Sequence, residues 1–361
     1  MREEDVLLWL CTTPGVGGVT VRNLQDYFGA WERIWAAQEA EMVQGAGIGI
    51  RQVRALLQGR DSFDPVQVRR QFEPAGIRFV TVLDPDYPEA LHELYDPPVG
   101  LFAAGQLAFS HDESLAVVGS RQPTSYGRLV TKQIVSECAT QGLTIVSGLA
   151  RGIDTVAHHA ALDRGGRTVA VLGSGLLKIY PRENERLARR IVDSGGAVLS
   201  EWHPLTPGKP GHFPVRNRLI SGLCQGTLVV EAGERSGSLI TADSALEQGR
   251  DVYAIPGPIN SPQSVGTNRL IQQGAKAVLG AGDVLEDYGR MAMTSSAGSA
   301  DSLAEDALFL LNALGVSEAH ADELLVRTGW ELGRLHKWLL RLQTAGQIGV
   351  LPGGKYIRIA K

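Results

Sequence analysis

The chain has 361 residues, of which 43% are hydrophobic and 20% are charged, and its formal net charge is −4. The length predicts two or three domains, and the composition is that of a globular protein with a full-sized core. A slightly acidic chain has no overall positive field that could hold a polyanion, so any nucleic-acid contact must come from a local basic patch.

Three features predict a cytoplasmic protein with no membrane contact. Cys11, Cys138 and Cys224 stand in apolar surroundings without CxxC spacing, which indicates buried thiols in a reducing compartment. The N-terminus begins with acidic residues and a short apolar run, unlike a signal peptide. No apolar stretch approaches the roughly 18 residues that are needed to cross a bilayer.

Residues 1–75 predict a small helical domain. "PGVGGVTVRNLQDYFG" and "GAGIGIRQVRALL" each place a Gly-x-Gly turn before an amphipathic helix. The pattern is similar to a helix-hairpin-helix or SAM-like domain, in which the backbone amides of a turn can face a phosphate. A plain helical bundle with glycine turns fits it equally well. Residues 83–105 are rich in proline and predict a connector.

From residue 115 onward, apolar strands alternate with amphipathic helices. The predicted strands are "LAVVGS", "LTIVSG", "TVAVLGSG", "AVLSEW", "TLVVEAG", "DVYAIPG" and "KAVLG". The predicted helices span 125–140, 152–164, 183–194, 214–224, 237–248 and 265–273. This alternation predicts a parallel sheet covered on both faces, with a ligand at the carboxyl ends of its strands.

The C-terminal part predicts a winged helix at 303–361 that follows a linker at 295–302. Three short helices precede "IGVLPGGKYIRIA", which suits a hairpin around Pro-Gly-Gly. The third helix, near 331–343, places Arg334, Lys337 and Arg341 on one face. Residues 301–361 hold seven acidic and seven basic residues. A neutral winged helix can dock a protein as well as DNA, and duplex DNA is therefore a candidate partner only through these three cations.

The first strand and its loop, "AVVGSRQPTSYG", lack the glycine pattern of a dinucleotide site. Arg121 stands where the second glycine of Gly-x-Gly-x-x-Gly is needed, and the second strand ends without a ribose-binding acid. We therefore expect no NAD, no FAD and no other cofactor or metal. Ser120 and Arg121 instead predict an anion site at the edge of the sheet.

Further cations, a serine and a glycine follow the neighbouring strands, so we expect these residues to line one groove. They are Ser147, Gly148 and Arg151 after the second strand, Arg182 after the third, and Lys209, Arg216 and Arg218 after the fourth. No Asp or Glu occurs from Trp202 to Val230. This acid-free run explains how a chain of net charge −4 could hold a polyanion.

Phe213 has two interpretations. An aromatic ring beside Lys209 and Arg216 can stack on a base while the cations hold phosphates. The same ring could be a hydrophobic staple that enters the core at the start of a helix.

Catalytic groups are few in this sequence. Asp154 and His158 share a helix face without a third partner, and Asp154 is suited to capping the helix start. Glu231, at a strand end, could stand as a general base. The segment from Ser236 to Thr241 should begin a helix whose backbone amides can bind a phosphate.

Six ordered motifs resemble the DNA-processing protein DprA (Smf) family over roughly residues 80–280. They are "VVGSRQPTSYG", "SGLARGIDTVAHHAAL", "AVLGSGLLKIYPREN", "SEWHPLTPGKPGHFPVRNRLISGL", "LVVEAGERSGSLITADSALEQGRDVYAIPGPI" and "GTNRLIQQGAKAV". The resemblance implies an extended Rossmann-like domain at 80–290 that binds single-stranded DNA and forms a homodimer. It also implies loading of RecA recombinase onto incoming strands during natural transformation. The predicted DNA-binding residues are Gly119, Ser120, Arg121, Ser147, Gly148, Arg151, Arg182, Lys209, Phe213, Arg216, Asn217 and Arg218.

A non-catalytic single-strand binder is therefore the first hypothesis, and an enzyme that cleaves nucleoside monophosphates is the alternative. Related Rossmann-like hydrolases place a Glu beside a glycine-rich phosphate loop. "EAGERSGSLITA" lacks the Pro-Gly-Gly-x-Gly-Thr pattern of those enzymes.

Overall fold

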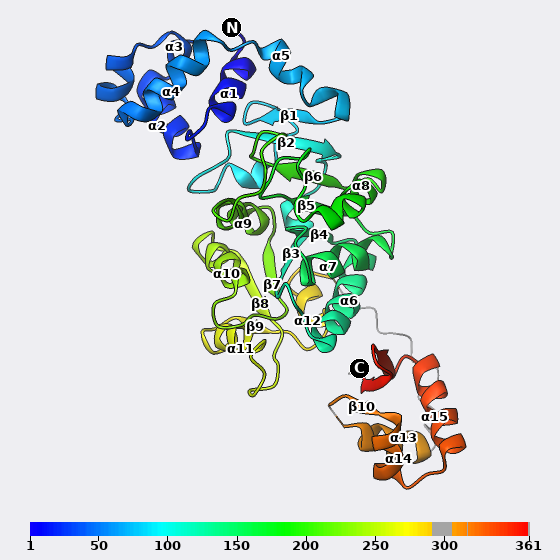
Figure 1. The fold of residues 1–361 in the computed structure, drawn as a ribbon. Coiled ribbons are helices and arrows are strands. Elements are labelled where there is room, and N and C mark those ends of the chain that lie inside the picture. The colour runs from blue at the N-terminus through cyan, green and yellow to red at the C-terminus, as the bar shows by residue number, and fades with distance from the viewer. Residues whose placement is uncertain (291–304, 316, 360–361) are drawn as a thin grey trace.

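The computed structural model describes residues 1–290, 305–315 and 317–359. Its centre is a nine-stranded sheet in the order β1-β2-β6-β5-β4-β3-β7-β8-β9, with a helical region before it and a winged helix after it (Figure 1). The linker predicted at 295–302 lies outside the described residues.

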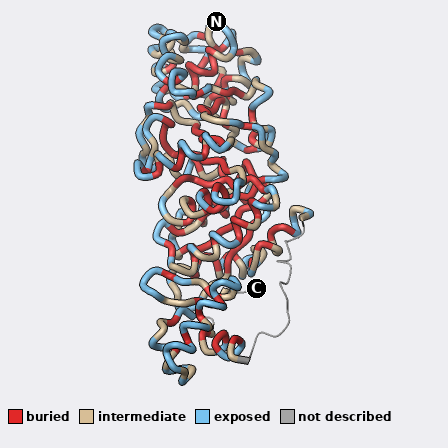
Figure 2. Tube along the Cα trace, turned by 90° about the vertical axis from the view of Figure 1, so that its right-hand side faces the viewer, coloured by how far each residue is buried: buried red, intermediate tan, exposed pale blue. Residues whose placement is uncertain are grey.

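The seven strands from β3 to β9 run parallel to one another, as the sequence predicts. Their bounds are β3 Ser114–Val118, β4 Thr144–Ser147, β5 Thr168–Val171, β6 Ala197–Ser200, β7 Gly226–Val229, β8 Asp251–Ala254 and β9 Lys276–Ala277. The central strands are buried throughout because helices cover both faces, which is why their sequences are apolar without alternation (Figure 2).

Helices cover the two faces of the sheet in two groups (Figure 1). One group is α6 Ser125–Thr140, α7 Ile153–Leu162, α8 Glu185–Asp193 and α12 Ala281–Leu285. The other is α9 His212–Gly222, α10 Gly237–Glu247 and α11 Val265–Gln272. All six predicted helices are present, and α12 is an addition.

Two strands of the nine-stranded sheet were not predicted, and both pair antiparallel. β1 (Arg78–Thr81) pairs with β2 (Gly100–Gly105), which pairs in turn with β6. The interpretation of 83–105 as connector is therefore wrong at its end. Prolines precede β2 and conceal it in the sequence, although Leu101, Phe102 and Ala103 are fully buried. Gly105 ends the strand with φ +90°, and a Cβ there would lie 2.2 Å from the carbonyl oxygen of Gly196.

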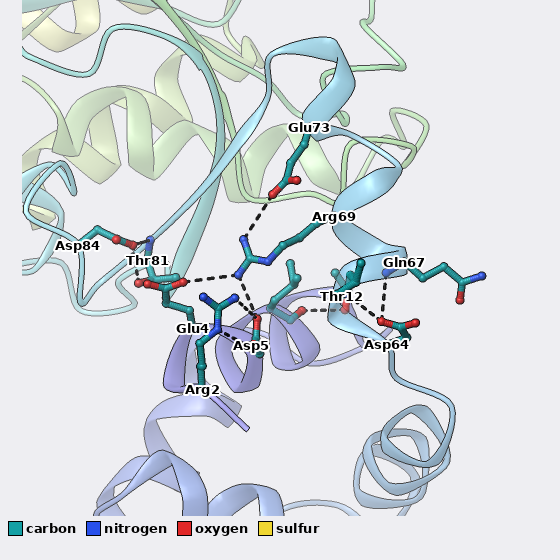
Figure 3. A network of polar contacts seen from close by, with 12 residues as sticks. Arg2, Glu4, Asp5, Thr12, Asp64, Gln67, Arg69, Glu73, Thr81 and Asp84 are labelled. Atoms are coloured by element: carbon teal, nitrogen blue, oxygen red, sulfur yellow. Dashed lines mark hydrogen bonds and ion pairs between the residues drawn. The ribbon is translucent and has the colours of Figure 1, made fainter.

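The N-terminal region is helical, as predicted. Its helices are α1 Glu3–Thr12, α2 Gly18–Phe28, α3 Trp31–Ala36, α4 Ile50–Asp61 and α5 Pro65–Arg70. Arg69 of α5 ties this region together by reaching back to Asp5 of α1 at 3.2 Å and to Glu73 at 3.8 Å (Figure 3). The Arg2 guanidinium also bonds Asp5, and the two arginines outweigh the effect of burial and lower the pKa of that carboxyl.

The C-terminal region has the predicted winged-helix order. It consists of α13 Glu305–Leu314, β10 Ala319–His320, α14 Ala321–Thr328, α15 Leu332–Thr344, β11 Ile348–Leu351 and β12 Lys355–Arg358. The hairpin predicted around Pro-Gly-Gly is β11 and β12, which pair antiparallel. The described helices of the whole chain include none that is both long and apolar enough to cross a membrane.

Candidate nucleic-acid interface

A groove of about 720 Å³ opens beyond the carboxyl ends of β3 and β7. The chain passes from β3 through β4 and β5 to β6 on one side, and then returns to place β7 on the other side of β3. This reversal is the switch point at which open α/β sheets bind ligands. The groove is lined from the loop after β3, from the start of α9 and from the start of α10.

The loop after β3 contributes Gly119, Ser120 and Arg121, as predicted. The Ser120 hydroxyl accepts a hydrogen bond from the backbone N–H of Gln122 at 3.1 Å and so shapes the turn. Gly152, with φ +80°, lies so close to this turn that a Cβ there would be 2.2 Å from the Ser120 carbonyl oxygen. Arg121 is exposed and has no carboxylate within ion-pair distance among the described residues.

Phe213 forms a wall of the groove beside Arg121. The Arg121 guanidinium lies over its ring at 5.5 Å, and the Tyr180 ring is 5.6 Å away. The ring is half-buried, and it packs so closely on Gly173 that a Cβ there would be 2.7 Å from it. Phe213 thus contacts both the core and the groove, so stacking on a base and stapling the helix both remain open.

Arg216 lies on the floor of the groove and is only 4% exposed. Its Nη1 donates to the carbonyl oxygens of Gly148, at 2.7 Å, and Val171, and its Nε donates to Asn217. Burial, together with the nearby Arg121 charge, lowers the pKa of Arg216 to about 10. The sequence placed this guanidinium at the groove, and the structure shows in addition that it is buried there against backbone carbonyls.

Arg218 does not reach the groove, which corrects the prediction. Its guanidinium contacts Glu201 at 2.6 Å and Asp96 at 3.6 Å. Residues 216 and 218 are two positions apart on α9, or about 200° around a helix, so their side chains leave on opposite faces. The expectation that one groove would take both cations ignored this rotation.

Three further predicted residues, Ser147, Arg151 and Arg182, make their contacts outside the groove. Ser147 is fully buried and donates to the Val117 carbonyl oxygen, so its hydroxyl serves the core. Arg151 forms a two-bond ion pair with Glu183, at 2.9 Å for both bonds. Arg182 is exposed beside Glu185. None of these three lines the groove.

Lys209 and Gly148 lie close to the groove without lining it. Lys209 is exposed, has no ion-pair partner among the described residues, and precedes the lining residue Pro210. Gly148 stays free of a side chain because a Cβ would be 2.6 Å from Nη2 of Arg216. Asn217 lines the groove and donates to the Gly237 carbonyl oxygen of α10 at 3.3 Å.

The start of α10 adds a wall that the sequence only partly indicated. Ser236, Gly237 and Ser238 line the groove, and the Ser236 hydroxyl caps the helix by accepting from the Ser238 backbone N–H at 3.4 Å. Arg235 also lines it, is exposed, and has no ion-pair partner in the part of the chain that the structure describes. The signal for Arg235 was present in "EAGERSGS", where it follows a strand like the other predicted cations.

The residues considered for catalysis have structural surroundings. Glu231 is buried and accepts from the Thr124 backbone N–H at 2.9 Å and from its hydroxyl at 2.5 Å, so it faces the start of α6 and does not line the groove. His158 is fully buried against Thr168, and burial lowers its pKa to about 3. Within the described residues, no group of three His, Cys, Asp or Glu side chains is placed to hold a metal ion.

Residues 78–289 match the family model described as DNA recombination-mediator protein A, and residues 294–354 match that of the DprA winged helix domain. The chain belongs to the DNA recombination-mediator protein A (DprA/Smf) family. Protein Smf of Escherichia coli K12 is 40% identical over 345 residues, which cover 91% of this chain and 90% of that protein. DNA processing protein DprA of Bacillus subtilis is 44% identical over 222 residues, or 61% of this chain and 74% of the relative.

Two solved structures of family members are similar to this chain. DprA from Streptococcus pneumoniae has a TM-score of 0.68 at 38% identity. The match covers 97% of that protein and 78% of this chain. DprA from Helicobacter pylori, whose structure concerns its single-stranded DNA binding mode, has a TM-score of 0.52 at 30% identity, covering 97% of it and 58% of this chain.

The winged helix of this family member carries the three predicted cations on α15. Arg334 contacts Asp306 at 2.6 Å and lies over the Trp330 ring at 4.7 Å. Arg341 lies over the Trp338 ring at 5.1 Å. Lys337 is exposed, without an ion-pair partner among the described residues. Two of the three cations are therefore already engaged with groups of the same domain.

Proposed function

We propose that this chain binds single-stranded DNA in the groove and acts, without catalysis, as a recombination mediator that loads RecA recombinase. The observation that carries the proposal is Arg121 beside Phe213. A cation with no carboxylate partner among the described residues lies over an aromatic ring in an open groove, and this combination holds phosphates and stacks bases without reading sequence. Lys209 and Arg235, exposed and without ion-pair partners in the described part of the chain, add positive charge near the groove.

Membership of the family supports the wider role. The solved structure of the Helicobacter pylori relative concerns its single-stranded DNA binding mode, and the matching family model is that of a recombination mediator. From these we infer a cytoplasmic role on incoming strands in natural transformation. We also infer a homodimer through the Rossmann-like domain, with the division at 1–75, 80–290 and 303–361. Duplex DNA is a secondary partner through Arg334, Lys337 and Arg341.

The test is a titration of fluorescently labelled oligo-dT at several salt concentrations. We expect saturable binding that weakens as a straight line on log–log axes, because bound phosphates release counterions. Binding should then speed the appearance of RecA filaments on strands already covered by a single-strand-binding protein. Oligo-dT affinity no greater than that of an unrelated acidic protein would contradict the proposal.

The enzymatic alternative has its own test. The protein is incubated with each nucleoside monophosphate and the mixture is analysed for free base. We expect none, because Glu231 faces α6 instead of the groove. Release of base that is lost in Glu231→Gln would overturn the non-catalytic part of the proposal and leave DNA binding to be judged separately.

A further inference from the structure

The floor of the groove holds a carboxylate as well as a guanidinium. Asp154 and Arg216 both line it, and they are only 6% and 4% exposed. The two side chains form no ion pair with each other within 4 Å among the described residues. Burial of a carboxylate and of a guanidinium is costly unless each has partners, so two such groups that line one surface without an ion pair between them are suited to binding a polar ligand.

Each group has one polar atom left over. Oδ2 of Asp154 accepts from the backbone N–H groups of Gly148, at 3.1 Å, and Ala150, at 3.2 Å, while Oδ1 accepts from no described group. Arg216 uses Nη1 and Nε on backbone carbonyls and on Asn217, and its Nη2 donates to no described group. Neither free atom is among the described side-chain atoms that are fully enclosed without a partner, and both residues line the groove.

The pair does not suit a phosphate. A phosphate offers only acceptors and carries negative charge, so the carboxylate of Asp154 would repel it at short range. The Watson–Crick edge of a nucleobase offers a donor beside an acceptor, and an acceptor beside a donor is its complement. Proteins that take a base out of a strand read it through that edge.

We propose that Asp154 and Arg216 hydrogen-bond the Watson–Crick edge of one nucleobase of the bound strand. The inference rests on the proposed function and deepens it: phosphates lie along Arg121, Lys209 and Arg235, and one base points down to the floor. For thymine, N3–H donates to Oδ1 of Asp154 and a ring carbonyl accepts from Nη2 of Arg216. Every base has such a donor–acceptor pair, so the subsite distinguishes a strand with bases from a bare sugar–phosphate chain.

The first test changes the DNA and leaves the full-length protein intact. Oligo-dT is compared with an oligomer of N3-methylthymidine, which keeps the charge and the stacking face but lacks the N3–H, and with an abasic oligomer. We expect the methylated strand to bind about threefold to tenfold more weakly than oligo-dT, the net effect of one typical hydrogen bond. The abasic strand should bind more weakly still. Equal affinity for oligo-dT and the methylated strand would overturn the proposal.

The second test is Asp154→Asn, which is nearly isosteric. Its amide oxygen can still accept from Gly148 and Ala150, while its amide nitrogen replaces the free acceptor of the groove by a donor. We expect oligo-dT to bind about threefold to tenfold more weakly than to the parent. Oligo-dC should lose less, because its N3 and O2 accept from two donors. The methylated strand should bind both proteins equally.

The control is Arg121→Ala, which should weaken every oligomer by a similar factor because it removes a phosphate contact. An Asp154→Asn protein that weakens all oligomers alike would show that Asp154 only shapes the loop, and would overturn the subsite. If the parent protein binds no oligomer at all, the proposed function itself fails. Parent binding that ignores the bases overturns this inference alone.

Discussion

An arginine lies over an aromatic ring both in the groove and on the winged helix, and the surroundings of the two arginines differ. In the groove, Arg121 covers Phe213 and has no carboxylate partner among the described residues. On the winged helix, Arg334 covers Trp330 and is held by Asp306 at 2.6 Å. The ring contact alone does not mark a binding surface, because in both regions it can fix the arginine of the free protein.

The two arginines differ in whether a carboxylate already binds the guanidinium in the free protein. A guanidinium paired with a carboxylate must give up that partner before it can bind a phosphate, whereas an unpaired one does not. The same division separates Arg218, which is paired with Glu201, from Arg121 within the Rossmann-like domain. The affinity for single-stranded DNA should therefore depend on the unpaired cations, whereas the paired cations should contribute to the stability of the fold.

The largest expected effect is that of Arg218→Ala on stability. The change leaves Glu201 partly buried without its partner, which should cost about 3 kcal/mol of unfolding free energy. Urea unfolding measures the loss, and the double variant Arg218→Ala with Glu201→Gln should recover much of it. Oligo-dT affinity of the folded protein should stay near that of the parent. Full stability with weakened, less salt-dependent binding would return Arg218 to the DNA site.

Phe213→Ala should have the next largest effect, on affinity. If the ring is a stacking platform, oligo-dT should bind more weakly by about 1–3 kcal/mol at every salt concentration, since stacking releases no counterions. If the ring is a staple, the cavity should cost about 3–5 kcal/mol of stability and the melting temperature should fall sharply. Melting and titration are measured on the same preparation. Parent-like affinity in a strongly destabilised protein would refute stacking.

The smallest expected effect is that of the winged helix on single strands. Arg334→Ala should change oligo-dT affinity by less than about 0.5 kcal/mol, because that cation is already paired on an exposed surface. A chain ending at residue 290 should stay folded and bind oligo-dT like the parent, which also tests the predicted domain division. Loss of single-strand binding on truncation would mean that the groove is not the main site.

Much of the sheet was readable from the sequence, because buried parallel strands and amphipathic helices leave clear apolar patterns. β2 was missed because prolines precede it and its pairing partner β6 is about 90 residues away. Within the site, position after a strand correctly brought Arg121 and Phe213 to the groove. It could not show that Arg151 and Arg218 meet Glu183 and Glu201, since the first pair joins segments after two different strands and the second joins α9 to the end of β6, 17 positions earlier.

The most direct test of this account compares the salt dependence of oligo-dT binding in Arg121→Ala and Arg151→Ala. The two arginines follow neighbouring strands and are both exposed, but only Arg151 has a carboxylate partner. The account predicts that Arg121→Ala flattens the log–log slope by about 0.7, the value for one phosphate contact on a single strand, while Arg151→Ala leaves it unchanged. Two slopes parallel to that of the parent, or a change in Arg151→Ala alone, would contradict it.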